Sequence, residues 1–134
     1  MIIYQKRVYP EDLEYNPHVY YMFSDSDKKE GHWQFRNYSN FVGVRVKKDE
    51  HAFDDSYWSD TTYEDNVSKI EEDFKKVQNI LKQNIPVIHS EQTFNLNILE
   101  YRSRSPKTCM YIEKWLNSIQ SYIFTAHNEW SKSI

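Results

Sequence analysis

Apolar residues follow two different periods along this chain, and the change of period predicts its elements. Short runs rich in β-branched and aromatic residues predict four strands, at 2–9, 18–24, 41–46 and 86–90. Between the third and fourth runs, apolar positions recur every three or four residues, which predicts an amphipathic helix over 62–83 with a capping box at Thr61 and Glu64. A second stripe of this kind predicts a last helix over 106–124 that begins at Pro106.

The segments between these elements are less regular. Residues 10–17 predict a short helical turn, and Asp25-Ser26-Asp27 predicts a turn after the second strand. Residues 94–103 fit either a helix or a loop, and 122–134 are predicted to form a flexible or extended tail. Because strands and helices interleave, we expect one α/β domain over 1–134, with helices flanking a layered, partly parallel sheet.

Composition narrows the class of protein. A chain of 134 residues is long enough to bury one core. Its net charge of -3 gives no general basic field, so direct nucleic-acid binding is not expected. The single cysteine, Cys109, excludes an internal disulfide and a multi-cysteine zinc site, and favours a reducing cytoplasm. No apolar stretch approaches a membrane span. We therefore expect a cytoplasmic protein with no membrane attachment, metal or cofactor.

Catalytic motifs are missing from the sequence. It contains no Gly-x-Ser-x-Gly elbow, no phosphate-binding Gly-x-x-x-x-Gly-Lys stretch and no His-Glu-x-x-His pair. The five histidines stand at unrelated spacings. Cys109, near the start of the last predicted helix, fits either an activated thiol or a small packing residue, and packing is favoured. No catalytic residue is assigned, and the sequence leans away from an enzyme.

Charge is segregated along the chain. Ten acidic residues and one lysine lie between Asp49 and Asp73, whereas 102–134 is mostly basic. An acidic loop that also carries rings could meet a basic surface on another protein, although a solvated loop fits the same pattern. The candidate contact residues are Phe53, Asp54, Asp55, Tyr57, Trp58 and Asp60. Arg36 with Lys47 and Lys48 could also form a small anion pocket or act as plain surface charges.

Five stretches carry a resemblance to a known group. They are MFSDS at 22–26, EGHWQFR at 30–36, NFVGVRVK at 40–47, FNLNIL at 94–99 and RSPK at 104–107. In order and spacing they resemble an uncharacterised family of small proteins found mainly in tailed phages, with VFGDN, GGQAxIR, GIPTK, GIGTGLA and RAPK motifs. That family is in turn similar to the macrodomain group, which binds ADP-ribose.

The resemblance implies a macrodomain-like or Rossmann-like fold and a set of ligand contacts. Asp25 would contact adenine or ribose, Arg36 and Lys47 would contact anions, and two loops would cradle the diphosphate. The first loop contains Gly31, and the second contains Asn95 and Asn97. Both loops have lost glycines that the family carries, to Ser24 and Glu30 in the first and to Thr93, Asn95 and Asn97 in the second. Glu30 would repel a phosphate, and Trp33 would fill space where a small residue is expected. We therefore expect the fold to be kept and the ligand chemistry to be lost.

Three functions follow as hypotheses. The first is a non-catalytic, phage-encoded accessory protein that binds a host protein in the host cytoplasm, as an inhibitor of a defence or nucleic-acid-handling system. The second is a macrodomain-like binder or hydrolase of ADP-ribose or a related signalling nucleotide. The third is a structural or self-assembling protein, with a homo-oligomer as the partner.

Overall fold

The computed structural model describes residues 1–51, 54–90 and 98–132. In chain order its elements are β1 (Ile2–Gln5), α1 (Pro10–Tyr15), β2 (Tyr20–Ser26), β3 (Phe41–Lys47), the 3₁₀ turns η1 (Asp54–Ser56) and η2 (Asp60–Thr62), α2 (Tyr63–Lys82), β4 (Val87–Ser90), α3 (Ile98–Arg104) and α4 (Pro106–Lys132). The predicted α/β class is confirmed.

The strands form one four-stranded sheet in the order β1-β4-β2-β3, and all three pairings are parallel. The sheet is therefore more regular than the partly parallel one predicted. β2 lies between β4 and β3 and is buried along nearly its whole length, as expected for an inner strand of a parallel sheet. All four strands end at the same edge of the sheet, so the segments that follow β2 and β3 meet there.

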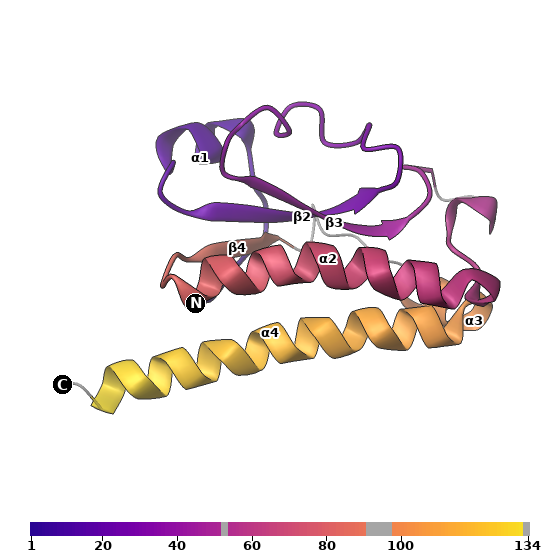
Figure 1. The fold of residues 1–134 in the computed structure, drawn as a ribbon. Coiled ribbons are helices and arrows are strands. Elements are labelled where there is room, and N and C mark those ends of the chain that lie inside the picture. Colours follow the sequence, from indigo (N-terminus) through magenta and orange to yellow (C-terminus); the bar gives the residue numbers. More distant parts are fainter. Residues whose placement is uncertain (52–53, 91–97, 133–134) are drawn as a thin grey trace.

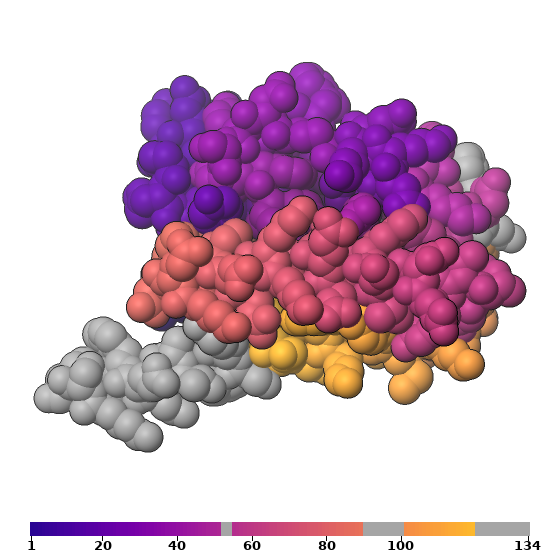
Figure 2. Space-filling model, viewed as in Figure 1, coloured from indigo at the N-terminus to yellow at the C-terminus, as the bar shows by residue number. Residues whose placement is uncertain are grey.

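Helices and loops cover both faces of the sheet (Figure 1). On one face lie α1 and the segment 27–40, and on the other lies α2, with α4 packed beneath it. The space-filling view shows the same arrangement, with residues of α1 and 27–40 forming the upper surface and α2 separating them from α4 (Figure 2). The sheet is thus enclosed between two unequal layers.

Each face of the sheet has its own apolar core. Alternate residues of β3, namely Val42, Val44 and Val46, point toward α2 and join the larger core. In that core Phe74 of α2 stacks on Trp115 of α4, with ring centroids 5.5 Å apart. The smaller core lies under α1 and 27–40, and contains Val8, Leu13, Tyr21, Phe23 and Ile88. Ile70, Phe74, Val77 and Leu81 of the first predicted stripe, and Ile112 and Ile119 of the second, are therefore buried in the larger core.

Several predicted boundaries are wrong. The first strand ends at Gln5 rather than at residue 9, because Val8 instead joins the smaller core under α1. β2 runs through Asp25 and Ser26, which were predicted to form a turn, because they pair with β3 at Arg45 and Lys47. Parallel pairing supplies the backbone partners that a turn would otherwise provide.

The predicted capping box is also wrong. Thr61 belongs to η2, where its backbone N–H donates to the hydroxyl of Ser59. α2 then begins after Thr62, whose side chain makes no capping hydrogen bond. At the other end of the chain, α4 continues to Lys132, beyond the predicted helix end at residue 124.

Candidate functional site

The carboxyl edge of β2 and β3 is the region where the sequence placed most of its ligand contacts. In open parallel α/β sheets this edge is where ligands bind, because the loops that follow neighbouring strands converge there. Asp25 is the penultimate residue of β2 and faces Arg36, which lies in the following segment. The structure therefore brings Asp25, Gly31 and Arg36 together as the sequence suggested.

Asp25 and Arg36 form a bidentate ion pair. Arg36 Nη2 lies 2.7 Å from Asp25 Oδ1, and Nη1 lies 3.1 Å from Oδ2. The same guanidinium donates through Nε and Nη2 to the carbonyl oxygen of Gly31, at 3.1 and 2.9 Å. Since Asp25 is 4% exposed, its charge is compensated inside the protein. The contacts of Arg36 with Asp25 and Gly31 therefore stabilise the 27–40 segment, and they use guanidinium donors that would otherwise be able to bind an external anion.

Both glycines of the chain make room for a carboxylate. A Cβ at Gly43 would lie 2.5 Å from Asp25 Oδ2, and a Cβ at Gly31 would overlap the carboxylate of Glu50. Glu50 also accepts a hydrogen bond from the Ser26 hydroxyl. Glycine allows close approach of another group to the backbone, which in a nucleotide site is a phosphate. Here the approaching groups are carboxylates of the chain itself.

His32 adds a partly buried imidazole to this cluster. Its Nε2 donates to the Ser24 carbonyl at 2.8 Å, and its ring lies 5.0 Å from that of Phe23. Burial lowers the pKa of His32, while the Ser24 carbonyl and the charges of Glu50 and Asp25 act in the opposite direction. The residue has a left-handed backbone, with φ of 56°, and so does Lys29, with φ of 53°. The loop keeps a bent shape without glycine at those two positions.

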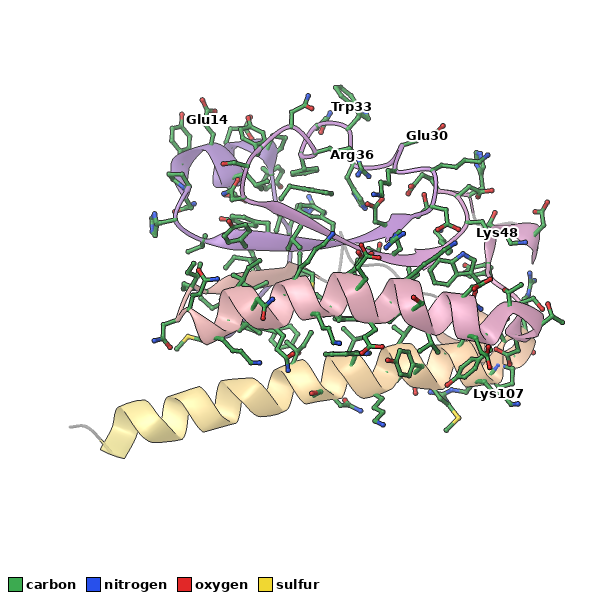
Figure 3. The ribbon with its side chains drawn as sticks, viewed as in Figure 1. Glu14, Glu30, Trp33, Arg36, Lys48 and Lys107 are labelled. Carbon is green, nitrogen blue, oxygen red and sulfur yellow. The ribbon has the colours of Figure 1, made fainter. Side chains whose placement is uncertain are left out.

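Trp33 is a large hydrophobic residue of this segment whose ring lies mostly in water. Its side chain is 74% exposed, and Figure 3 shows it pointing away from the sheet, with Glu14 of α1 and Glu30 on the same side of the molecule. The expectation that Trp33 fills space inside the loop is therefore wrong. The missed signal was the polar sequence around Trp33, because all the other residues from 28 to 34 are charged, polar or glycine.

Two rings of the segment predicted to bind another protein, Tyr57 and Trp58, are inside the fold. Tyr57 is 7% and Trp58 is 3% exposed, so the expectation that these rings are exposed is wrong. Trp58 Nε1 donates to Asp27 Oδ2 at 2.9 Å. Asp60 caps α4 by accepting hydrogen bonds from the backbone N–H groups of Lys107 and Thr108. These three side chains hold the segment against the sheet and α4.

The remaining predicted contacts are spread around this edge. Asp55 is exposed, whereas Phe53 and the side chain of Asp54 lie outside the described residues, as do Asn95 and Asn97. Lys47 ends β3, and its Nζ donates to the His51 carbonyl at 3.0 Å and lies 5.5 Å from the centre of the Tyr57 ring. Lys47 contacts a different part of the chain from Arg36.

The chemistry of Cys109 matches a packing residue. Its side chain is fully buried, and burial, followed by the nearby Glu113 carboxylate, raises the pKa of the thiol to about 11. Among the residues that the structure describes, no three His, Cys, Asp or Glu side chains gather as a metal site. None of the described helices is long and apolar enough to cross a membrane.

The fold and this edge define a class: a parallel α/β domain whose carboxyl edge is filled by its own ion pairs. Within that class, the model of DUF7831, a family of unknown function, matches residues 3–115, so the chain belongs to the DUF7831 family. No curated protein and no solved structure matches the chain significantly.

Proposed function

We propose that this protein acts by binding another protein through a surface that we call the Trp33 face. It consists of three exposed residues that lie on one side of the molecule: Glu14 of α1, and Glu30 and Trp33 of the 27–40 segment (Figure 3). The observation that supports the proposal is the 74% exposure of the Trp33 ring. A tryptophan left in water on a folded domain is the residue type most enriched among interface anchors.

The base beneath Trp33 is held firmly, which reduces the entropy lost on binding. Arg36 connects the segment to Asp25 through the bidentate pair described above. Asn40, the last residue of the segment, donates to the carbonyl oxygens of Leu13 and Asn16, both at 3.0 Å, and so joins the segment to α1 and the residue that follows it. Phe35 and Tyr38 pack on the smaller core. The Trp33 ring therefore projects from a preorganised base.

The face also indicates the chemistry of the partner. Glu14 and Glu30 lie on the same side of the molecule as Trp33, one on α1 and one in the same segment as the ring (Figure 3). The complementary surface is an apolar pocket for the indole with basic side chains at its rim. We propose that the partner is a host protein, because the resemblance to small phage proteins implies that this chain acts in a host cell. The host protein would be inhibited when its complementary surface is covered by the Trp33 face.

A photocrosslinking amino acid placed at Gln34, next to Trp33 and exposed, tests the proposal in an extract of host cells. The matched control carries the same amino acid at Lys76, which is exposed on α2. We expect one protein to be captured from position 34 and not from position 76. The affinity of that protein for the Trp33→Ala variant should then be about 30-fold weaker, as expected for an anchor worth about 2 kcal/mol.

Trp33→Ala should keep the free energy of unfolding within about 0.5 kcal/mol, because the ring is mostly in water. The loss of affinity would then report on contact rather than on folding. An unchanged dissociation constant for the variant, or equal capture from both positions, would remove the Trp33 face from the proposal.

The alternative, binding or hydrolysis of ADP-ribose, has less support from the geometry. Arg36 and Asp25 are engaged with each other, and Glu50 occupies the space beside Gly31 that a phosphate would need. A thermal-shift titration with ADP-ribose and NAD tests it directly. A ligand at about 100 times its dissociation constant would stabilise the fold by about 2.7 kcal/mol, and a shift of that size lost in Arg36→Ala would favour this alternative.

A further inference from the structure

A groove of about 200 Å³, which we call the α2–α4 groove, lies between these two helices. It is lined by Gln78 of α2 and by Tyr111, Lys114, Trp115 and Ser118 of α4. The two helices lie side by side on the face of the sheet opposite to α1 and the 27–40 segment (Figure 1). Because pockets for drug-sized ligands measure about 300–1,000 Å³, a groove of this size suits a single side chain.

Two half-buried rings form the apolar part of the α2–α4 groove. Trp115 stacks on Phe74, with the ring planes 3° apart and the centroids 5.5 Å apart, so one face of the Trp115 ring is held by the core. Tyr111 also packs against the larger core, and both rings remain partly exposed. Rings held in this way offer a rigid contact for another aromatic side chain. The side-chain oxygens of Gln78 and Ser118 can accept a hydrogen bond from an indole N–H.

The rim of the α2–α4 groove is positive. Every carboxylate of α2 from residue 71 onward, and of the described side chains of α4, forms an ion pair: Glu71 with Lys75 at 2.8 Å, Glu72 and Asp73 with Arg45 at 3.2 and 2.8 Å, and Glu113 with Arg102 at 2.6 Å. Lys114 at the groove is exposed, and so is Lys82, one helical turn after Gln78. These two lysines add positive charge to a region whose described carboxylates are already neutralised.

The Trp33 face has the opposite character. Its ring is 74% exposed, and the acidic residues Glu14 and Glu30 lie on the same side of the molecule. The α2–α4 groove is complementary to this face, because it offers an aromatic-lined recess for one side chain and a positive rim. Figure 3 shows Trp33 on one side of the sheet and Lys107 of α4 on the other. A single copy therefore cannot bring its own ring to its own groove.

We propose that the Trp33 ring of one copy of this chain docks in the α2–α4 groove of a second copy. The inference rests on the role of Trp33 as an anchor in the proposed function, and it gives the same ring a second partner. Since the ring and the groove face opposite ways, each contact leaves one ring and one groove free, so the assembly is head-to-tail and grows beyond a dimer. A host protein that binds the ring would displace one copy from the next, so self-assembly controls access to the Trp33 face.

Sedimentation velocity of the purified full chain, from about 10 μM to about 1 mM, tests the proposal. We expect the weight-average sedimentation coefficient to rise with concentration past the value for a dimer, and to fall when potassium chloride is increased, because salt screens the rim charges. Trp33→Ala and Lys114→Glu should each weaken the association by about 10-fold or more. The matched control is Lys48→Glu, an equal change of charge at an exposed position that follows β3 (Figure 3), and it should leave the association unchanged.

A mixture of two variants tests the head-to-tail geometry. Trp33→Ala keeps an intact groove and Lys114→Glu keeps an intact ring, so each alone should stay monomeric at concentrations where the original chain associates. An equimolar mixture of the two should form a 1:1 complex that grows no further. Ser118→Gln, at an exposed position of the lining, narrows the groove without a change of charge and provides an independent second groove variant. Circular dichroism confirms that each variant is folded.

Three results would overturn the proposal. They are a chain that stays monomeric up to about 1 mM, equal association of the original chain and both single variants, and no complex in the mixture of Trp33→Ala with Lys114→Glu. Capture of a host protein from position 34 separates this inference from the proposed function. Lys114→Glu should keep that capture, because the groove takes no part in it. Capture without self-association would remove only the α2–α4 groove, and self-association without capture would remove only the host protein.

Discussion

Removing either partner of the Asp25–Arg36 pair should destabilise the fold, and removing Arg36 should cost more. The side chain of Asp25 is 4% exposed and that of Arg36 is 25% exposed. Arg36→Ala leaves a buried carboxylate with one described donor, the backbone N–H of Ser26. Asp25→Ala leaves a guanidinium that still donates to the Gly31 carbonyl and that water can reach. The difference in burial therefore sets the order of the two effects.

The magnitudes follow from this asymmetry. Breaking a buried pair from one side costs about 3–5 kcal/mol, so we expect about 3–4 kcal/mol for Arg36→Ala. Partial solvation reduces the cost of Asp25→Ala to about 2 kcal/mol. In the double variant no charge is left uncompensated, and we expect about 3 kcal/mol in total. The double variant should thus be about 2–3 kcal/mol less destabilised than the sum of the two single variants.

Urea denaturation followed by circular dichroism measures these free energies, and urea is preferred because guanidinium chloride would screen the ion pair. The matched control is the exposed pair of Lys75 and Glu71, whose side chains are 59% and 40% exposed. Its coupling should not exceed about 0.5 kcal/mol. If the two single effects at Asp25 and Arg36 add within about 0.5 kcal/mol, the pair is not the stabilising unit described here.

Three further outcomes are expected. His32, whose pKa is lowered by burial, should make the free energy of unfolding fall as the pH drops below about 6.5, because the unfolded chain then binds a proton that the folded chain does not. His32→Asn, which suits a left-handed backbone, should remove that dependence in urea titrations at several pH values. Cys109, with its pKa raised to about 11, should react with iodoacetamide at pH 8 only as fast as the protein opens, so urea should accelerate the labelling. Trp58→Ala should cost about 3–5 kcal/mol in thermal or urea unfolding, and a loss below about 1 kcal/mol would contradict its place in the core.

The elements that the sequence predicts well are those with a strong period. The helix at Tyr63–Lys82 and the strand at Phe41–Lys47 lie within one residue of their predicted bounds, because each buries a regular series of apolar residues in the larger core. The end of β2 was missed because acidic and hydroxyl residues usually indicate a turn. Asp25 is instead buried by a partner 11 residues further along the chain, which no local pattern reveals.

The candidate site shows the same limit more sharply. The sequence assigned Asp25, Gly31 and Arg36 to one ligand site, and the structure brings these residues together, but the sequence did not reveal that Asp25 and Arg36 neutralise each other. From the sequence, the Trp58 ring was expected to be exposed and the Trp33 ring to fill space, whereas the structure shows the reverse. Both errors have one cause, since the exposure of an aromatic residue depends on long-range packing. Trp58 is covered by Lys69 and hydrogen-bonded to Asp27, whereas the Trp33 ring projects into water.

Carboxylates of the chain occupy the places where a parallel α/β domain would present donors to a phosphate. Glu50 lies against Gly31, Asp25 receives the fork of Arg36, and Asp60 accepts the first free N–H groups of α4. Each is an intramolecular anion, so no ligand is needed to satisfy the donors, and the edge is rigid without one. An exposed anchor residue binds a partner best from an ordered edge, because the conformational entropy of the loop has then already been lost on folding and is not lost again on binding. The filled edge is therefore consistent with the protein-binding surface proposed above, because its donors already have intramolecular partners.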